Sequence, residues 1–416
     1  MNEMSSVPQM PAPAPVPAPS VKVDFSGTRG DFFRLVRNGA ALELITFGFY
    51  RFWLATDIRR HLWSNTLIEG NAAEYTGRGK ELLIGFLFAI AIIMPIYLAY
   101  FLVGLEVERF KAFASLPLFL FFYLFGQFAI YRARRYRLTR TVWRGVRFWM
   151  DGSGWAYAAR AALWSLLMIP TLGLILPWRE AALERYKMRH CHYGDLQGDF
   201  AGTGWDLFKR GWWLWLLAIA LIVSLYGPML VAALPGKLLL PKTVAGITSV
   251  ISLVGFFSAP FIYGVFKAIE WRWWLSGIRF GEVRFESALR RGALVGLYWK
   301  VIGWFLLAMV LFAAYLFAGA GLVAKISQTP MARIFTPGNL HGGGIAMLVL
   351  AGIGYLAFIL ALNVVLRIYL QRDVWARIVA STTVHHIEAA ANVSARGELA
   401  SALGEGFADG LDIVGF

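Results

Sequence analysis

Long apolar runs separated by short basic segments dominate the chain. The run Leu82–Val103 contains no ionisable side chain other than tyrosines. A helix needs about 20 consecutive apolar residues to cross the hydrocarbon core of a bilayer. One such run could be a buried helix of a soluble protein, but several in one chain predict a polytopic membrane protein. The predicted spans are Leu82–Val103, Ala114–Tyr131, Trp212–Leu234, Thr243–Phe266, Gly296–Val323 and Ile345–Leu370.

Two further apolar stretches are interrupted. Asn38–Thr56 contains Glu43 and a Thr-x-Gly sequence, and Tyr157–Trp178 contains a second Thr-x-Gly together with two prolines. Each stretch either crosses as a kinked helix or turns back as a hairpin, whose broken helical hydrogen bonds must be satisfied inside the protein. We therefore expect an all-α membrane fold with six to eight crossings. The hinge residues are predicted to be Thr46, Gly48, Pro170, Thr171, Gly173 and Pro177.

The distribution of basic residues favours two hairpins. Lys and Arg are enriched in short cytoplasmic loops of membrane proteins. If neither interrupted stretch crosses, 30 Lys and Arg residues fall on one side of the membrane and 6 on the other. If both stretches cross, the basic segments 57–81 and 132–156 lie on the outer side. The sequence thus predicts six crossings and two hairpins entered from the cytoplasm, with both termini cytoplasmic in either case.

Internal repeats are the most specific feature of the sequence. Thr46-Phe47-Gly48, Trp53 and Arg60 recur 125 positions later as Thr171-Leu172-Gly173, Trp178 and Arg185. At the same offset, the segment Tyr75–Gly79 corresponds to Phe200–Gly204. A partial copy lies between them at an offset of 75, where Arg134-Arg135 corresponds to Arg59-Arg60. Because each predicted pair of spans starts from the cytoplasm, the repeats are expected to be parallel, with an axis along the membrane normal.

The repeats suggest how the chain is divided. The stretch Arg279–Phe285 alternates between apolar and polar residues, as does part of Gly145–Phe148, so short β-hairpins are expected at the cytoplasmic surface. Residues 1–22 read as a disordered tail rich in proline and alanine, without the apolar core of a cleavable signal peptide. The remaining divisions are a first membrane repeat at 23–131, a second at 132–266, a third helix pair at 267–372 and a cytoplasmic segment at 373–416.

These residues resemble a known family. The runs FSGTRGDFFRL and NGAALELITFGFYRFWLATDIRRHLWSNTLIEG, with the second copy TLGLILPWREAALERYKMRH and FAGTGWDLF, are similar to the YjgN family of bacterial inner-membrane proteins of unknown function. The resemblance extends from Val23 to the terminal GEGFADGLDIVGF. The first copy departs from the family pattern at Tyr50–Trp53 and at Asn71–Tyr75. The resemblance implies an inner-membrane location and a repeated architecture, and it implies no reaction.

Composition narrows the choice of partners. The chain has 416 residues and a formal net charge of +15, with 58% hydrophobic and 16% charged residues. In so apolar a chain, anionic lipids are the expected partners of the basic residues, and nucleic acid is not expected. Cys191 is the only cysteine, so no internal disulfide can form. The sequence does not indicate an oligomeric state.

The sequence gives little support for catalysis or for a metal. His190-Cys191-His192, with Asp195 and Asp199 nearby, is the best metal candidate, but adjacent ligands point in different directions and lack the spacing of a zinc site. A second group, His385-His386 with Glu388, is equally weak. No phosphate-binding loop or pairing of nucleophile and base is visible. We therefore expect no enzyme activity, no cofactor and no metal.

Basic and aromatic residues next to the expected cytoplasmic interface form the candidate site. Arg side chains pair bidentately with phosphate, and Trp anchors at the level of lipid headgroups. The simpler interpretation is that these residues only anchor the protein and set its topology. The functional hypotheses are a transporter or channel for a small or anionic solute and, as the alternative, a non-catalytic organiser that binds anionic lipid. The candidate residues are Trp53, Arg59, Arg60, Arg134, Arg135, Trp178, Arg179, Arg185 and Arg189.

Overall fold

The computed structural model of the protein describes residues 20–106, 111–233, 242–328, 330 and 343–400. Six helical segments among these residues are long and apolar enough to cross a membrane, and each overlaps one of the predicted spans. The six segments are Gly79–Leu102, Leu116–Thr139, Gly204–Ser224, Ser249–Gly277, Val295–Ser327 and Gly343–Ala380.

The expectation of an all-α fold is wrong, because ten short strands form a closed antiparallel barrel. The strands follow the order β1-β10-β9-β8-β7-β6-β5-β4-β3-β2 around the barrel. Full closure pairs every strand on both sides, so no sheet edge is left open. The strands are β1 (Ser20–Phe25), β2 (Thr66–Ile68), β3 (Asn71–Tyr75), β4 (Thr141–Trp143), β5 (Val146–Met150), β6 (Cys191–Tyr193), β7 (Leu196–Phe200), β8 (Ile278–Phe280), β9 (Val283–Ser287) and β10 (Thr382–His385).

Each pair of strands encloses a pair of helices, and this unit occurs five times in the described chain. Units one to five are Ser20–Ile68, Asn71–Trp143, Val146–Tyr193, Leu196–Phe280 and Val283–His385. The helices are α1 (Arg29–Ile45), α2 (Arg51–Ser64), α3 (Gly79–Glu106), α4 (Lys111–Thr139), α5 (Gly154–Leu166), α6 (Leu176–Arg189), α7 (Gly204–Ala233), α8 (Lys242–Gly277), α9 (Val295–Ser327) and α11 (Gly343–Leu366), which continues through the π-helix η2 (Arg367–Asp373) into α12 (Val374–Ala380).

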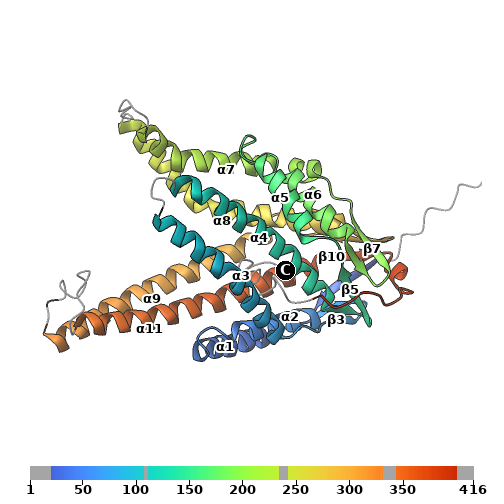
Figure 1. Ribbon diagram of the computed structural model, residues 1–416, viewed down its shortest axis with the longest axis horizontal. Helices are drawn as coiled ribbons and strands as arrows, with labels where there is room; N and C mark the ends of the chain where they lie inside the picture. The colour runs from blue at the N-terminus through green and yellow to red at the C-terminus, as the bar shows by residue number, and fades with distance from the viewer. Residues whose placement is uncertain (1–19, 107–110, 234–241, 329, 331–342, 401–416) are drawn as a thin grey trace, which may run out of the picture.

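The units are arranged around the barrel. The barrel lies at one end of the molecule, and the long helices α7, α8, α9 and α11 extend away from it in the same general direction (Figure 1). The pairs α1–α2 and α5–α6 are much shorter and stay near the barrel. Because β1 pairs with β10 as well as with β2, unit five lies beside unit one and the ring of units is closed.

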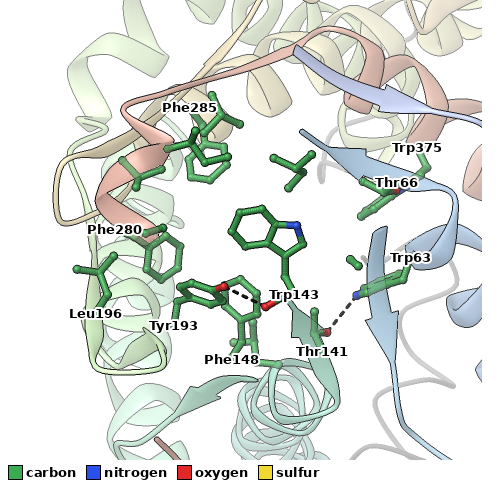
Figure 2. Close-up of a pocket in the computed structure, with 17 residues that line it drawn as sticks. Trp63, Thr66, Thr141, Trp143, Phe148, Tyr193, Leu196, Phe280, Phe285 and Trp375 are labelled. Atoms are coloured by element: carbon green, nitrogen blue, oxygen red, sulfur yellow. Dashed lines mark hydrogen bonds between the residues drawn. The ribbon is translucent and has the colours of Figure 1, made fainter. Parts of the chain in front are cut away.

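The strand register places equivalent residues of the five units at the same level of the barrel. The last residue of each longer strand pairs with the first residue of the next short strand, as in Phe25 with Thr66 and Tyr75 with Thr141. Since side chains alternate along a strand, the first and third residues of each short strand face the same side. Figure 2 shows the resulting interior, which is lined by the rings of Trp143, Tyr193, Phe148 and Phe280.

A shared cap starts the first helix of several units. The Thr28 hydroxyl accepts a hydrogen bond from the Asp31 backbone N–H at 3.1 Å, and Thr203 does the same for Asp206 at 3.1 Å. A hydroxyl at this position satisfies one of the unpaired amides of the first helical turn. In both units the threonine belongs to the short turn that connects the strand to the first helix.

Both Thr-x-Gly segments are the tips of hairpins that turn back toward the barrel. Phe47 and Gly48 have φ angles of 51° and 87°, and Leu172 and Gly173 have angles of 48° and 80°. The Thr46 hydroxyl donates to the Leu42 carbonyl oxygen at 2.7 Å and accepts from the Tyr50 N–H, so the broken helical hydrogen bonds are replaced locally. Neither hairpin contributes one of the six helical segments that are long and apolar enough to cross a membrane.

The exposed tips are apolar. Phe47 is 94% exposed, and Ile169 and Leu172 are also largely exposed. Clusters of exposed apolar side chains mark contacts with another apolar phase. The two hairpin tips therefore present apolar surface, as the six long apolar helices do.

Close helix packing explains why Trp and Gly recur together at the offset of 125. A Cβ atom added to Gly204 would lie 2.6 Å from the Trp178 Cα atom, and one added to Gly79 would lie 2.8 Å from the Trp53 Cα atom. The start of α7 therefore lies directly on the start of α6, and the start of α3 on α2. Only glycine allows backbones to approach so closely.

Replacing Gly204 by alanine is expected to destabilise the protein by about 1–3 kcal/mol, because the new methyl group meets backbone atoms that cannot rotate away. The measurement is the midpoint of thermal unfolding of the protein in nanodiscs. The control is Gly211→Ala on the same helix, where a Cβ atom would meet nothing within 4 Å. Since alanine is the better helix former, the control should be neutral or slightly stabilising. Equal effects of the two substitutions would contradict this account.

Candidate functional site

A charged cavity lies where three of the inner helices reach the barrel. Its volume is about 220 Å³, and its walls come from α4, α6 and α8, the second helices of units two, three and four. Four lining residues are basic and three are acidic, so the cavity carries one net positive charge when all are ionised. The lining residues are Ile130, Arg134, Arg137, Glu180, Glu184, Lys187, Lys267, Glu270, Trp271, Trp273 and Trp274.

Glu184 is at the centre of this group. One carboxylate oxygen accepts from Arg134 Nη1 at 2.9 Å and from Trp274 Nε1 at 3.0 Å, and the other pairs with Lys187. Burial alone raises the pKa of a carboxyl, but here Lys187 and Arg134 together lower the pKa of Glu184 to about 2. Glu184 is therefore ionised at any physiological pH, and it holds the two cations in place.

A second carboxyl of the cavity behaves differently. Burial raises the pKa of Glu180 above its usual range. The carboxylates of Glu270 and Glu184 raise this pKa further, whereas the cations of Arg179 and Lys187 lower it by less than burial and the two carboxylates together raise it. Glu180 pairs directly with Arg179. Across the cavity, Lys267 Nζ lies 2.7 Å from a carboxylate oxygen of Glu270. The cavity thus combines a permanently ionised carboxylate with one that takes up a proton more readily.

The pseudo-symmetry of the units explains why the charges meet here. Arg59, Arg134, Glu184, Trp271 and Trp375 all lie seven residues before the short strand that ends their unit. The same position is thus basic in units one and two, acidic in unit three and aromatic in units four and five. Opposite charges face each other only between α4 and α6, so the ion pair Arg134–Glu184 joins equivalent positions of neighbouring units.

Most of the other predicted site residues bind the protein's own backbone or carboxylates. Arg60 Nη2 donates to the Gly77 carbonyl oxygen at 2.7 Å, and Arg185 Nη2 donates to that of Gly202 at 3.3 Å. Arg372 repeats this contact with Gly27 at 2.6 Å, although the sequence analysis did not select it. These arginines join the second helical segments of units one, three and five to the strand-to-helix turn of the next unit.

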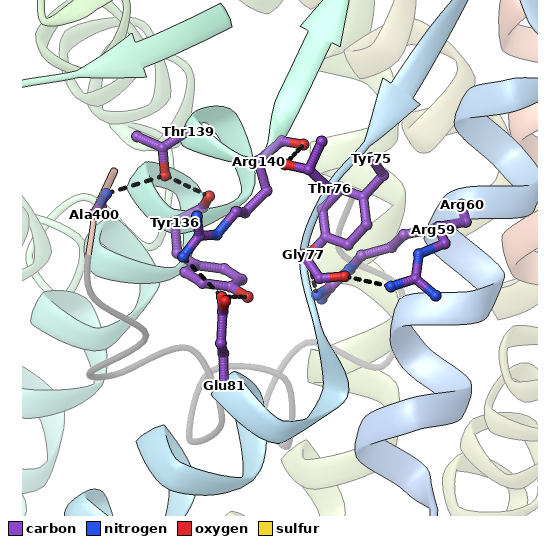
Figure 3. A network of polar contacts seen from close by, with 10 residues as sticks. All are labelled: Arg59, Arg60, Tyr75, Thr76, Gly77, Glu81, Tyr136, Thr139, Arg140 and Ala400. Carbon is purple, nitrogen blue, oxygen red and sulfur yellow. Dashed lines mark hydrogen bonds and ion pairs between the residues drawn. The ribbon is translucent and has the colours of Figure 1, made fainter. Parts of the chain in front are cut away.

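Figure 3 shows this fastening at unit two. The Arg60 guanidinium reaches Gly77, while Arg59, which is buried, lies 3.3 Å from the Tyr75 hydroxyl oxygen. On the other side of the same turn, Glu81 accepts a hydrogen bond from the Tyr136 hydroxyl at 2.7 Å and pairs with Arg140 at 2.8 Å. In this region Arg59 is buried against Tyr75, whereas Arg60 contacts the Gly77 carbonyl oxygen and remains exposed.

The remaining predicted residues are dispersed. Trp53 and Trp178 cover the glycines at the starts of α3 and α7, as described above. Arg189 pairs with Asp199 at 3.4 Å, and Arg135 has a buried Nε without a partner in the described part of the chain. Of the nine candidates, only Arg134 lines the charged cavity, with Arg179 next to it through Glu180. The hinge residues form the two hairpin tips, except Pro177, which is in the first turn of α6.

Glu43, the charge inside the first interrupted stretch, is also paired. It is 8% exposed, and one carboxylate oxygen lies 2.8 Å from Arg367 Nη2. Arg367 is the first residue of the π-helix that follows α11. The pair therefore joins unit one to unit five at the seam where the ring of units closes.

The His190-Cys191-His192 segment is divided by strand geometry. His190 Nδ1 lies 2.7 Å from an Asp151 carboxylate oxygen, whereas the His192 ring stacks on Trp149 with centroids 4.1 Å apart. Cys191 is buried between them, and burial raises the pKa of its thiol to about 12. In the part of the chain that the structure describes, no three His, Cys, Asp or Glu side chains come together as a metal site.

Sequence reasoning missed the acidic half of the cavity. Glu180, Glu184 and Lys187 are spaced i, i+4 and i+7 and therefore share one face of α6. Lys267 and Glu270 are spaced i, i+3 and likewise share one face of α8. This spacing can be recognised in the sequence, but it does not show that the two faces line one cavity together with α4.

Comparisons with known proteins give a family but no activity. A family model described as "Bacterial protein of unknown function (DUF898)" matches residues 20–410. No curated protein and no solved structure matches the chain. The matched range begins at β1 and extends past β10, so it covers all five units of the barrel. The chain therefore belongs to this bacterial family of unknown function.

Proposed function

We propose that the protein is a bacterial inner-membrane transporter that binds a small anionic solute in the charged cavity between α4, α6 and α8. The observation that carries the proposal is the convergence of seven charged side chains from three units on one cavity of about 220 Å³. Charged side chains that converge on one cavity and perturb each other's pKa values are candidates for a ligand site. The excess of basic over acidic side chains favours an anion.

The proposed orientation places the barrel in the cytoplasm. Every basic segment of the sequence lies at the barrel end of the helices, and lysine and arginine are enriched on the cytoplasmic side. Since β1 and β10 are neighbours in the barrel, the chain would enter and leave from that side. In this orientation the cavity is reached from the cytoplasm or along the inner faces of α4, α6 and α8.

Glu180 supplies a way to couple binding to pH. Its raised pKa means that it takes up a proton before an ordinary carboxyl would as the pH falls. Protonation removes one negative charge from the cavity, so its net positive charge increases. Anion uptake is therefore expected to rise as the pH is lowered from neutral.

The alternative proposal is an organiser that binds an anionic lipid. It is favoured by an apolar groove of about 480 Å³ formed by α6, α7, α8 and the turn before α6. On α8, Tyr263 lines the groove and Lys267, one turn later, lines the cavity. On α6, Pro177 lines the groove, and Glu180, about one turn later, lines the cavity. A lipid chain in the groove would thus place its headgroup near the charged cavity.

Uptake into proteoliposomes tests the transport proposal. Purified protein is reconstituted, and uptake of labelled phosphate, lactate and glutamate is compared with that of a zwitterion and a cation and with empty liposomes. Lys267→Met is expected to reduce uptake of the transported anion at least ten-fold, because a charged hydrogen-bond donor is lost from the cavity. Lys209→Met is the control, since Lys209 is exposed on α7 and packs on Trp205.

The outcomes separate the two functions. Anion uptake that depends on Lys267 and on pH, with the pH dependence removed in Glu180→Gln, supports transport. No uptake above empty liposomes, combined with an anionic lipid that co-purifies with the native protein but not with Lys267→Met, contradicts transport and supports the organiser. Equal uptake by Lys267→Met and Lys209→Met would exclude the cavity as the solute site.

A further inference from the structure

The segment that follows β10 runs from one end of the barrel to α4. The short helix η3 (Ile387–Ala390) contributes two residues to the lining of the barrel interior and so covers that end. The Ser394 backbone N–H then donates to an Asp195 carboxylate oxygen at 3.1 Å, in the turn between β6 and β7. The Ala400 N–H donates to the Thr139 hydroxyl at 3.4 Å, at the end of α4 (Figure 3). The last described residue of the chain is therefore held against α4.

One face of α4 is buried over almost three turns, starting from this contact and running back along the helix. Four residues at intervals of three or four share this face, and each is at most 2% exposed. They are Thr139, Tyr136, Ala133 and Ala129. Arg132 lies on the same face and is half-buried. Burial that continues over this length of one helix needs a continuous cover of protein.

Described side chains cover only the part of this face that is near the barrel. Tyr136 belongs to a buried cluster with Phe52 and Leu82. Phe52 is in the first turn of α2, so α2 begins at this level and extends no further along α4. Ala133 and Ala129 lie about one and two turns beyond, and no other buried or partly buried apolar side chain of the described chain packs against the pair. Their burial is therefore not explained by the described side chains.

Residues 401–416 have the position and the length to supply this cover, because they follow directly on Ala400. Ten residues of α4, about 15 Å of helix, separate Thr139 from Ala129. The seven residues from Ala400 to Phe407 span up to about 23 Å when extended. The family model matches the chain as far as residue 410, so this part of the segment belongs to the matched range. The segment is therefore long enough to lie over both alanines.

The composition of residues 401–416 also matches the buried face of α4. The segment contains six large apolar residues, three acidic residues and four glycines, and no basic residue. Glycine allows a backbone to approach closely, and alanine on α4 leaves room for it. Arg132 and Arg135 carry positive charge beside the alanines, and like charges at this spacing on a helix repel each other. Acidic side chains next to them relieve this repulsion.

We propose that residues 401–416 bind along the buried face of α4, with apolar side chains over Ala129 and Ala133 and carboxylates toward Arg132 and Arg135. The segment then fills the space that the short hairpin of unit one leaves beside α4. None of these four α4 residues lines the charged cavity, so the contact is independent of the proposed transport.

Disulfide formation between introduced cysteines tests the contact in the full-length protein in nanodiscs. Ala129→Cys is combined in turn with a cysteine at each of three apolar positions of the segment. These substitutions are Leu403→Cys, Phe407→Cys and Leu411→Cys. The matched control replaces Ala129→Cys by Leu120→Cys, since Leu120 is 50% exposed and lies about two and a half turns away, on the opposite face of α4. At least one pair with position 129 is expected to oxidise about five-fold faster than its control pair, because a disulfide needs close Cβ atoms.

Mass spectrometry of the oxidised protein reads the outcome, and native Cys191 does not interfere because it is buried. Equal rates with positions 129 and 120, or disulfides only between two copies of the chain, would overturn the proposal. Hydrogen exchange of the unmodified protein is a second test that needs no variant. The amides of residues 403–412 are expected to exchange about ten-fold more slowly than those of a free peptide of the same sequence. Exchange at the rate of the free peptide would also overturn the proposal, even if the cysteine variants failed to fold.

Discussion

Replacing Glu184 by glutamine is expected to lower the free energy of unfolding by about 3–5 kcal/mol, among the largest effects of any single substitution in this protein. Glutamine can still accept the hydrogen bond from Trp274. It cannot neutralise Arg134 and Lys187, whose side chains are 19% and 12% exposed and lose their shared anion. Removing one partner of a buried ion pair leaves an uncompensated charge, and this penalty exceeds the net gain from making the pair.

The measurement is unfolding in mixed micelles, followed through the thiol of Cys191. Because this thiol is buried and its pKa is raised to about 12, it should react with a maleimide only after the surrounding structure opens. Glu69→Gln is the control. Because Glu69 pairs with Arg144 near the surface, this substitution should lower the free energy of unfolding by less than about 1 kcal/mol. A Glu184→Gln protein as stable as the control would show that the cluster contributes nothing to folding.

The same substitution predicts a change in acid stability. The pKa of Glu184 is lowered in the folded protein, so its stabilising contribution is complete above the ordinary value of 4.5 and declines as the pH falls toward about 2. The native protein should therefore lose stability below pH 4.5 more steeply than Glu184→Gln does. Parallel pH profiles of the two proteins would contradict the assignment of this carboxylate.

Replacing Glu43 by glutamine is also expected to lower the free energy of unfolding by about 3–5 kcal/mol, here at the contact between units one and five. Arg367 would keep its position at the start of the π-helix without its anion, and its Nη1 already lacks a partner in the described part of the chain. The pair is one of two ion pairs between α1 and η2, the other being Arg29–Asp373, and it is the more buried one, so its loss should weaken the seam between units one and five. Thermal unfolding in nanodiscs measures the loss.

A double substitution tests whether the unpaired charge of Arg367 causes the loss of stability in Glu43→Gln. Glu43→Met with Arg367→Met removes both charges and fills the space with apolar side chains, which often restores or exceeds the original stability. We expect the double variant to be within about 1 kcal/mol of the native protein. Asp57→Asn provides a control, because Asp57 pairs with Arg60 near the surface. If the single and double variants were equally unstable, the charge pair would not be the cause.

The sequence predicted the membrane part of the fold well and the barrel poorly. An apolar run as long as Leu82–Val103 is recognisable as a candidate membrane span from its length alone. The two Thr-x-Gly segments were recognised because a positive φ at glycine and a threonine bonded to the preceding turn are local features. Strands such as Thr141–Trp143 have three residues, too few for a period of two to be distinguished from chance.

The barrel also depends on pairings that local sequence cannot show. The alternation at Arg279–Phe285 does form the β8–β9 hairpin. The pairing of β1 with β10, however, joins residues from opposite ends of the chain, and only this pairing closes the sheet. The repeats held the missing information, because the offsets of 125 and 75 relate the first unit to the third and to the second.

The candidate site was only partly predictable for a related reason. A sequence does not show that the guanidinium of Arg60 donates to the backbone carbonyl of Gly77, a residue of the next unit. The charges that converge in the cavity lie on three helices from three units. Their meeting follows from the arrangement of units around the barrel, which composition and spacing do not reveal.

The closure of the barrel by its first and last strands has a consequence for biogenesis. During synthesis, β1 emerges first but cannot complete its pairing until β10 follows the last long helix, tens of seconds later at ordinary translation rates. Throughout that interval the nascent protein has inserted helices on one side and an open sheet edge on the other, and open edges recruit foreign strands. The growing chain is therefore expected to require shielding at the membrane surface until its final unit arrives.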